Sequence, residues 1–352
     1  MPLLTRMVTS PLFIDIGPGA VARLGALLQD RRISPDGQVA VAVGPGQGER
    51  VVEAIRPSLA NADVYQVTDG TVDAAMRLQA QLRTRAYDAV VGIGGGRTLD
   101  VTKFAATRIG LPMVAVATNL AHDGIASPVS SLVHEGGKGS FGVAMPLAVV
   151  VDLDFVRQAP TEMVRSGVGD VVSNLTAIDD WMLAARERGE PVDGLAVTFG
   201  RTAAHAVLHR TDTVDSEAFL SVLAEALVLS GLAMAVAGSS RPSSGGDHEI
   251  MHAIDQLYPG TSNHGELAGV GALFSAYLRG DAARFTGISA CLVRHGLPRL
   301  PKELGLDEEQ FAAAVEYAPQ TRPERYTILE HLALSPEEIR ERVSGYVAAV
   351  DR

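Results

Sequence analysis

The first 155 residues alternate between short apolar runs and stretches with helical spacing, and this alternation constrains the fold more than any other feature. The runs are rich in β-branched residues and cover 38–43, 63–67, 88–93, 113–118 and 147–155. Residues 72–85 and 98–108 have the apolar spacing of helices. Continuous apolar strands that alternate with helices predict a parallel sheet covered on both faces, which is a Rossmann-like α/β domain.

The rest of the chain has a different pattern. Long segments rich in Ala, Leu and Val show helical periodicity, and polar turn clusters separate them. The best of them cover 161–186, 193–210, 214–237 and 264–279. No strand-like run of comparable quality follows residue 160. We therefore predict an α/β domain over 1–158 and an all-α domain over 159–352, with few functional signals in the acidic end at 301–352.

Charge and composition narrow the class of protein. The 352 residues carry a net charge of −11, and this argues against nucleic acid or an anionic membrane as the main partner. Cys291 is the single cysteine, so no internal disulfide can form and a reducing compartment is expected. The N-terminal residues lack signal-peptide character, and no uninterrupted apolar run approaches the roughly 20 residues of a bilayer span. We expect a cytoplasmic protein that does not insert into a membrane.

A glycine-rich turn in the first domain indicates a nucleotide site. Residues 87–106 form an apolar strand, then Gly94, Gly95 and Gly96, then a helix that contains Asp100. Glycines allow close backbone approach to a ligand, and the start of a helix favours a pyrophosphate. The turn differs from the usual G-x-G-x-x-G pattern and follows the third or fourth strand. The alternative is a strand-to-helix turn without a ligand.

A second polar segment follows the next strand. Thr118 and Asn119 end the run, and His122, Asp123 and a Ser/Pro-rich loop come next. Open α/β sheets place their ligand sites at the carboxyl ends of strands. The loop could also be polar simply because water surrounds it.

Three separate segments of the helical half contain residues that can bind a metal. His248 and His252 are four apart and share one helix face, and His264 opens the next helix. Asp170 lies near the start of a long apolar helix, where its alternative role is a helix cap. Two imidazoles and one carboxylate leave an open coordination position, as in catalytic zinc sites.

Residues 248–252 (HEIMH) also match the H-E-x-x-H pattern of zinc peptidases, with Glu249 as the base and His264 or Glu266 as a third ligand. The context disagrees with a peptidase. The glycines of the longer metzincin pattern are absent, and the α/β half would have no purpose.

The motifs GGGRTLD, AHDGIASP, GDVVSNL, GSSRPSSGGDHEI and NHGE occur in one order between residues 10 and 275. With them the chain resembles the iron-containing (group III) alcohol dehydrogenase superfamily, and is most similar to its sn-glycerol-1-phosphate dehydrogenase and glycerol dehydrogenase-like branch. The resemblance implies a dehydroquinate synthase-like fold, in which a nucleotide domain and a helical domain enclose NAD(P) and a divalent metal. It implies reduction of a small ketone phosphate, here dihydroxyacetone phosphate to sn-glycerol 1-phosphate, in a cytoplasmic homo-oligomer.

The resemblance also assigns roles to residues. Asp170, His248 and His264 match the metal ligands, and His252 and Asp123 match residues beside the substrate. The positions that match the cofactor site are Gly94, Gly95, Gly96, Asp100, Thr118, Asn119, Ser127, Val129, Val133 and Lys138. We expect His252 or metal-bound water to move a proton, Asp123 to orient a hydroxyl, and Arg241 and His252 to bind a substrate phosphate.

Departures from the family pattern refine these expectations. Asn174 stands where four-ligand iron enzymes have a histidine, which favours a three-ligand site that holds Zn²⁺, with Fe²⁺ or Ni²⁺ as alternatives. Arg97 replaces a more usual lysine, and Asp247 replaces a smaller residue before His248. At the tip of the second strand, Gly44–Pro45 offers no carboxylate to a ribose 2′-hydroxyl, so NADP is favoured slightly over NAD.

Three alternatives stay open at this stage. The first is a dehydrogenase of another polyol or keto-phosphate in a biosynthetic pathway. The second is a dehydroquinate-synthase-like cyclase, in which NAD and zinc act on a sugar phosphate without net redox change. The third is a ligand sensor on a retired dehydrogenase fold.

Overall fold

A computed structural model describes residues 10–59, 62–135 and 137–351 of the chain. The chain divides into two compact units. The first contains residues up to Asn119, Gly124–Ala159 and Met234–Ser239, and the second contains Leu120–Asp123, Pro160–Ala233 and Ser240–Arg352.

A six-stranded parallel sheet forms the centre of the first unit. Its strands are β1 (Phe13–Gly17), β2 (Val39–Val43), β3 (Asp63–Gln66), β4 (Ala89–Gly94), β5 (Met113–Ala117) and β8 (Ala148–Asp152), in the order β1-β8-β5-β4-β2-β3. Every residue of β4, β5 and β8 is buried, as continuous apolar runs predict.

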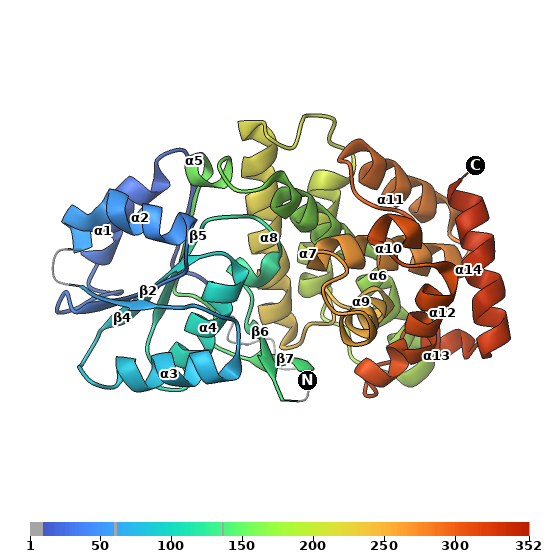
Figure 1. Ribbon diagram of the computed structural model, residues 1–352, viewed down its shortest axis with the longest axis horizontal. Coiled ribbons are helices and arrows are strands. Elements are labelled where there is room, and N and C mark those ends of the chain that lie inside the picture. The colour runs from blue at the N-terminus through green and yellow to red at the C-terminus, as the bar shows by residue number, and fades with distance from the viewer. Residues whose placement is uncertain (1–9, 60–61, 136, 352) are drawn as a thin grey trace, which may run out of the picture. The chain divides into compact units, whose positions relative to one another are not determined.

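Helices cover both faces of this sheet (Figure 1). They are η1 (Ala20–Arg23), α1 (Leu24–Leu28), α2 (Gln47–Ile55), η2 (Arg56–Leu59), α3 (Val72–Leu82), α4 (Gly96–Thr107) and α5 (Leu153–Val156). Alternate strand residues such as Val41, Ile93 and Val116 pack in one cluster with Leu24 and Val51 of the α1 and α2 layer. Helices α3 and α4 lie on the opposite face. The predicted α/β class is confirmed.

Two elements of the first unit were not predicted. Strand β1 begins close to the N-terminus and forms one edge of the sheet. Residues 129–132, expected to belong to a Ser/Pro-rich loop, lie in strand β6 (Val129–His134), which pairs antiparallel with β7 (Gly137–Gly142). The strands are half exposed and rich in Ser and Gly, so they lack the apolar run by which the other strands were recognised.

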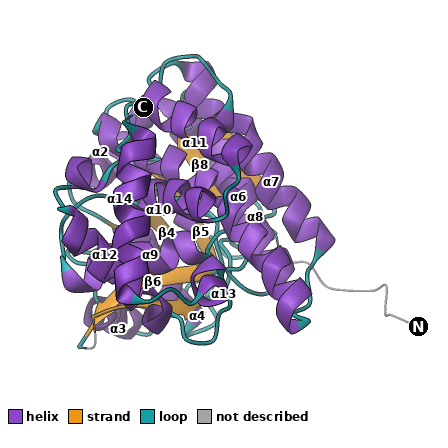
Figure 2. Cartoon of the chain, turned by 90° about the vertical axis from the view of Figure 1, so that its right-hand side faces the viewer, coloured by secondary structure: helices purple, strands orange, loops and turns teal. Residues whose placement is uncertain are grey.

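The second unit is helical, and its described residues contain no strand (Figure 2). Its helices are α6 (Thr161–Arg188), α7 (Gly194–Leu208), α8 (Glu217–Ala237, whose last turn belongs to the first unit), α9 (Gly246–Leu257), α10 (His264–Leu278), α11 (Ala282–Arg294), η4 (Pro301–Leu304), α12 (Glu308–Tyr317), η5 (Ala318–Thr321), α13 (Ile328–Leu332) and α14 (Pro336–Val350). Helix α6 ends at Gly189 in the left-handed conformation, and the Asp193 carboxylate caps α7.

Helix α8 bears on the expectation that the chain does not insert into a membrane. Its 21 residues are long and apolar enough to cross a bilayer, although Glu225 interrupts the run and no such segment was expected. In the structure 61% of its most apolar window is buried inside the protein. Core helices of soluble proteins share these properties, so the helix is weak evidence for a membrane span.

Candidate active site

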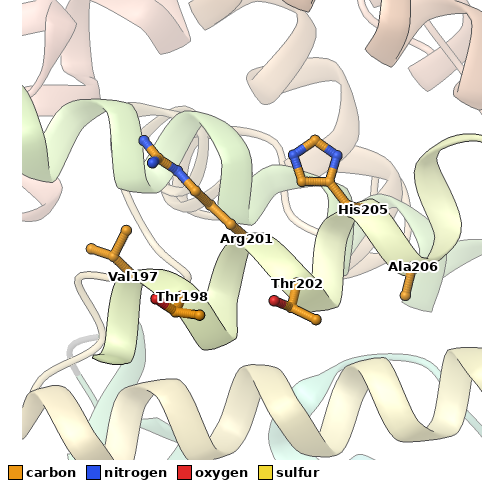
Figure 3. A pocket seen from close by; sticks show the side chains of 6 residues that line it. All are labelled: Val197, Thr198, Arg201, Thr202, His205 and Ala206. Atoms are coloured by element: carbon orange, nitrogen blue, oxygen red, sulfur yellow. The ribbon is translucent and has the colours of Figure 1, made fainter. Parts of the chain in front are cut away.

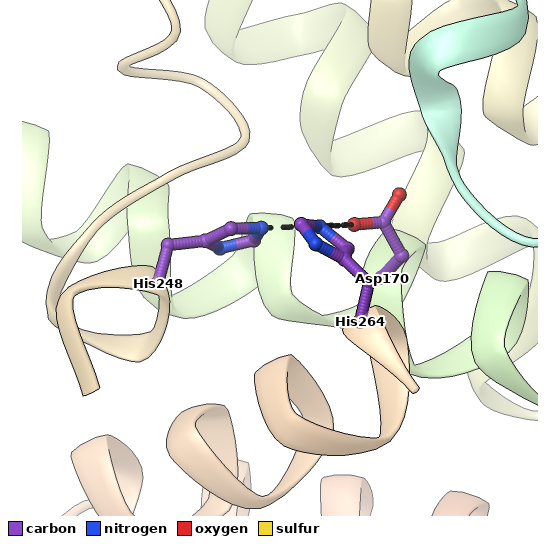
Figure 4. Close-up of side chains that lie close together, drawn as sticks. All are labelled: Asp170, His248 and His264. Atoms are coloured by element: carbon purple, nitrogen blue, oxygen red, sulfur yellow. Dashed lines mark ion pairs between the residues drawn. The ribbon is translucent and has the colours of Figure 1, made fainter. Parts of the chain in front are cut away.

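Asp170 of α6, His248 of α9 and His264 of α10 come together in the second unit (Figure 4). Their ligand atoms lie within 4.8 Å of one another. The Asp170 Oδ1 atom is 3.2 Å from His264 Nε2 and 3.6 Å from His248 Nε2. A carboxylate and two imidazoles are the donor set of catalytic zinc, which keeps a further position for water or substrate. The residues present therefore fit a divalent metal.

Close contact between two helices brings Asp170 and His264 together. A Cβ atom added to Gly265 of α10 would lie 1.7 Å from the Ser166 carbonyl oxygen of α6. A Cβ atom on Gly169 would lie 2.0 Å from the Gly265 carbonyl oxygen. Only glycine fits at these two positions, each of which is next to a candidate ligand. The glycines therefore allow the close helix contact that brings Asp170 and His264 together.

Asp247 orients the His248 ring. This fully buried carboxylate places Oδ1 at 2.7 Å from His248 Nδ1 and accepts a hydrogen bond of 2.6 Å from the Thr176 hydroxyl at Oδ2. A carboxylate at Nδ1 keeps a proton on that nitrogen and leaves Nε2 as the donor toward a metal. In the sequence alone, Asp247 stood out only as a departure from the family pattern.

The electrostatics of the cluster favour a cation. Burial alone would raise the pKa of Asp170, but the His248 and His264 imidazoles outweigh this effect and lower it well below its ordinary value. Burial alone would lower the pKa of His248, whereas Asp170 and Asp247 raise it to about 9. The carboxylates thus hold positive charge at His248 Nε2. A divalent cation can supply that charge in place of the proton.

Asp123 lies beside the ligand set. Its backbone N–H donates to Asp170 Oδ2 at 2.9 Å, and its carboxylate accepts a hydrogen bond of 2.9 Å from Ser230. Asn174 donates to the same Ser230 hydroxyl at 3.0 Å. Asn174, at the position where a fourth ligand was considered, therefore belongs to the hydrogen-bond chain that orients Asp123.

The His252 ring lies next to that of His248, with 6.5 Å between centroids. Its Nε2 atom is 3.0 Å from Arg322 Nη2. A guanidinium has donors only, so Nε2 is the acceptor and the His252 proton resides on Nδ1. Glu249 points elsewhere, because its carboxyl accepts from the Thr327 hydroxyl, and burial raises its pKa to about 9. This arrangement does not support Glu249 as a peptidase base.

Arg241, predicted to bind a substrate phosphate, pairs with a carboxylate in the structure. The guanidinium is buried and forms a bidentate pair with Glu190, with Nε 2.7 Å from Oε1 and Nη2 bonded to Oε2. The N–H groups of the guanidinium that could donate to a phosphate thus donate to the Glu190 carboxylate. The geometry argues against Arg241 as the phosphate-binding residue.

In the first unit, the glycine turn joins β4 to α4 at Gly94–Gly96. Strands β2 and β3 lie on one side of β4, and β5, β8 and β1 lie on the other, so the strand order reverses between β2 and β4. Ligands of open α/β sheets bind at this switch point. A Cβ atom on Gly95 would lie 2.5 Å from Asn119 Nδ2, and Thr118 N–H donates to the Gly94 carbonyl at 3.0 Å. The turn, Thr118 and Asn119 therefore form one edge that fits a dinucleotide.

Asp100 has a structural contact, and its role at the cofactor stays a prediction. Its Oδ1 atom is 3.0 Å from the Nζ atom of Lys103, and both side chains are buried. Lys103 Nζ also donates to the carbonyls of Gly124, Ser127 and Val129. The pair therefore anchors the 124–129 loop, which carries two predicted cofactor residues.

Val133 and Lys138 are register partners in the β6–β7 hairpin, and both are exposed. The Val133 N–H donates to the Gly70 carbonyl at 3.0 Å, and a Cβ atom on Gly70 would lie 2.6 Å from Arg97 Cγ. The hairpin is thus connected through Gly70 to the residue that follows Gly96. This brings Val133 to the edge that holds the glycine turn.

A separate hollow lies along α7 (Figure 3). Its lining comes from one helix: Val197, Thr198, Arg201, Thr202, His205 and Ala206. None of these residues belongs to the Asp170–His248–His264 set. No cluster of converging ligand atoms accompanies the hollow among the described residues. We therefore place the candidate active site at the ligand set.

Two arginines of the C-terminal segment were missed by sequence reasoning. Arg322 contacts His252, and Arg325 donates to the Ser244 carbonyl and the Ser240 hydroxyl just before α9. The only signal in the sequence is the pair of arginines in TRPERY at 321–326, and an acidic, apparently solvated segment gave no reason to single it out.

Comparison with known proteins identifies relatives over most of the chain. Residues 15–160 match the family model of iron-containing alcohol dehydrogenases. A glycerol-1-phosphate dehydrogenase [NAD(P)+] of Methanosphaerula palustris is 36% identical over 330 residues, which cover 93% of this chain and 90% of the relative. A protein of the same name from Hyperthermus butylicus is 35% identical, with 96% and 98% coverage.

Solved structures show the same fold. A probable glycerol dehydrogenase from Sinorhizobium meliloti superposes with a TM-score of 0.79 at 19% identity, and 99% of each chain is covered. A sulfoacetaldehyde reductase from Bifidobacterium kashiwanohense in complex with NAD+ gives a TM-score of 0.74 at 19% identity, with 97% and 99% coverage. The predicted combination of an α/β part and a helical part is confirmed.

Proposed function

The chain belongs to the iron-containing alcohol dehydrogenase family and, within it, to the group of glycerol-1-phosphate dehydrogenases, and from this premise we propose that it interconverts dihydroxyacetone phosphate and sn-glycerol 1-phosphate with NAD(P)(H) and a divalent metal. One observation carries the proposal. Asp170, His248 and His264, from three helices, converge with the donor chemistry of a catalytic metal site.

We propose Zn²⁺ as the metal, because the site offers two imidazoles and one carboxylate, and Asn174 rather than a histidine stands at the position considered for a fourth ligand. Asp170, His248 and His264 would hold it. When bound, the metal supplies Lewis acidity that polarises a carbonyl and lowers the pKa of an alcohol. Asp247 and Thr176 keep the His248 ring in the orientation that this requires.

Neighbouring side chains would position the substrate and move its proton. The Asp123 carboxylate accepts a hydrogen bond from Ser230, and a carboxylate can accept several hydrogen bonds, so it could also accept one from a substrate hydroxyl. His252 lies one helical turn beyond His248 and carries its proton on Nδ1. A neutral imidazole can pass protons near pH 7, so His252 is the proposed proton carrier.

The glycine turn of the first unit would bind the dinucleotide, which supplies the hydride. The backbone of Gly94–Gly96 and the start of α4 offer N–H groups to a pyrophosphate. Gly44 directly follows β2 beside this turn, and a Cβ atom there would lie 2.1 Å from Thr98 Oγ1. No carboxylate side chain stands at Gly44–Pro45, and this supports use of NADPH as well as NADH.

The test measures nicotinamide absorbance with purified protein and dihydroxyacetone phosphate. Reduction should require added Zn²⁺ after chelation, and rates with NADPH and NADH measure the cofactor preference. His264→Ala should abolish stoichiometric metal binding and lower activity by at least about 100-fold, while dinucleotide binding persists. An active, metal-free His264→Ala variant would overturn the proposed mechanism.

The same measurement separates the alternatives. Turnover of a sugar phosphate without net oxidation of NAD(P)H would favour the cyclase. Preference for another ketone would favour a different dehydrogenase. The cytoplasmic location and the homo-oligomeric state stay predictions, and light scattering of the purified protein tests the latter.

A further inference from the structure

The connection between α12 and α13 lies against the helix that carries His248. It begins with η5 (Ala318–Thr321), which packs on α9 (Gly246–Leu257). Arg322 contacts His252, four residues after His248, and Arg325 bonds to the carbonyl of Ser244, four residues before it. The two guanidinium groups thus contact the α9 segment on either side of a candidate metal ligand.

Positive charge is concentrated at this connection. Arg241 has a carboxylate partner in Glu190, but the N–H groups of Arg325 bond to a carbonyl and a hydroxyl, and no described carboxylate pairs directly with them. Burial, followed by repulsion from Arg322 and Arg241, lowers the pKa of Arg325 to about 10, against the attraction of Glu249 and Glu324. Both arginines stay charged at neutral pH. A bound dianion would relieve the repulsion between them.

We propose that Arg322 and Arg325 form the subsite that binds the phosphate of the substrate, with His252 holding Arg322 in place. The inference rests on the proposed function, which supplies a phosphorylated ketone to this site. A planar guanidinium group can donate two parallel hydrogen bonds to two phosphate oxygens. This bidentate geometry strengthens the binding and fixes the orientation of the phosphate. The metal site recognises the reacting oxygen, and the arginines recognise the other end of the same molecule. The subsite takes the role that the sequence had assigned to Arg241.

The decisive measurement is a specificity ratio. We compare kcat/KM for dihydroxyacetone phosphate with kcat/KM for unphosphorylated dihydroxyacetone, in the zinc-loaded protein. Arg322→Gln and Arg325→Gln should each lower the ratio by about 10- to 100-fold, the range of one lost charged hydrogen-bond pair. Arg322→Lys keeps the positive charge but loses the planar guanidinium, so its specificity ratio should lie between those of the wild type and Arg322→Gln. Arg340→Gln on α14, an exposed residue paired with Glu309, is the matched control and should leave the ratio unchanged.

Binding of inorganic phosphate gives a second readout without turnover. Calorimetric titration of the wild-type protein should show saturable binding, weakened by the same factor in Arg322→Gln and Arg325→Gln. Ratios and phosphate affinities within threefold of wild type would overturn the subsite. An equal loss of activity toward both ketones would also overturn it, because it would indicate a general structural role. If the wild-type protein reduces neither ketone, the proposed function fails, and the phosphate titration still decides the subsite.

Discussion

Asp247 carries more of the site than its position beside a ligand would indicate. Its Oδ1 atom accepts hydrogen bonds from the backbone N–H groups of Gly245 and His248 and faces His248 Nδ1 as well. The other oxygen accepts from Thr176. Each contact fixes the carboxylate, and the carboxylate fixes the imidazole. Asp247 is larger than the residue that the family pattern predicts at this position, and these hydrogen bonds satisfy its buried carboxylate.

We expect Asp247→Asn to lower zinc affinity by about 10- to 100-fold, because an amide cannot supply the charge that makes His248 Nε2 a strong donor. Thr176→Val removes one hydrogen bond to the same carboxylate and should cause a smaller loss. Competition with a chromophoric chelator measures both affinities, and thermal unfolding of the metal-free proteins controls for folding. Unchanged zinc affinity in Asp247→Asn would show that Asp247 has no positioning role.

Asp88 gives the first unit a dependence on pH. Burial alone would raise its pKa, but hydrogen bonds from the Gln38 and Asp36 backbone and the Ser34 hydroxyl outweigh this and lower it. A carboxyl whose pKa is lower in the folded state stabilises the fold above the unfolded value of about 3.9. That contribution disappears as the pH falls through the folded pKa.

We therefore expect the unfolding free energy of the wild type to be higher than that of Asp88→Asn by roughly 1 kcal/mol at pH 7. Hydrogen bonds to a charged carboxylate contribute more stability than those to a neutral amide, and solvent screens part of this difference. The gap should shrink steadily below about pH 4. Urea denaturation at several pH values measures it. A gap that widens on acidification would contradict the lowered pKa of Asp88.

At the scale of elements, sequence periodicity predicts five of the parallel strands and the long helices closely. Strands β2, β4, β5 and β8 bury continuous apolar runs, and the long helices bury regularly spaced apolar residues. Helix α6, expected over 161–186, occupies Thr161–Arg188. The β6–β7 hairpin escapes prediction because its Ser and Gly residues pair through backbone groups and bury little apolar surface. Residues that can bind a metal are visible in the sequence, whereas their supports, such as Asp247 and Arg322, depend on contacts between distant segments.

Helix packing at Gly265 offers a test of how the elements bring the ligands together. Gly265→Ala would force its Cβ atom against the Ser166 backbone, so α6 and α10 must separate. We expect a loss of about 1–3 kcal/mol in unfolding free energy from this overpacking, and weaker zinc binding because Asp170 and His264 move apart.

Gly287→Ala is the matched control for that variant. It lies inside α11, and a Cβ atom there has no neighbour within 4 Å. Alanine at such a site should be neutral or stabilise by up to about 1 kcal/mol. If Gly265→Ala behaves like Gly287→Ala in both stability and zinc affinity, the close helix contact is not what sets the ligand distance.

At the scale of the whole molecule, the two candidate ligand sites belong to different structural units. The metal ligands and their supports all lie in the second unit, and the glycine turn with Thr118 and Asn119 lies in the first. Each unit has its own buried core, so binding of one ligand should order mainly the unit that holds it. The same division explains why sequence reasoning could treat the nucleotide signal and the metal signal independently.

Hydrogen exchange of the intact chain tests this division. Zn²⁺ should slow exchange in α6, α9 and α10, because a metal that joins three helices opposes their local opening. NADP+ added alone should instead slow exchange around residues 94–107 and 118–119, where backbone N–H groups face the proposed pyrophosphate site. The His264→Ala variant should lose the effect of Zn²⁺ and keep that of NADP+. Zinc protection that is strongest in the first unit would mean that the cation binds somewhere other than the Asp170–His248–His264 set.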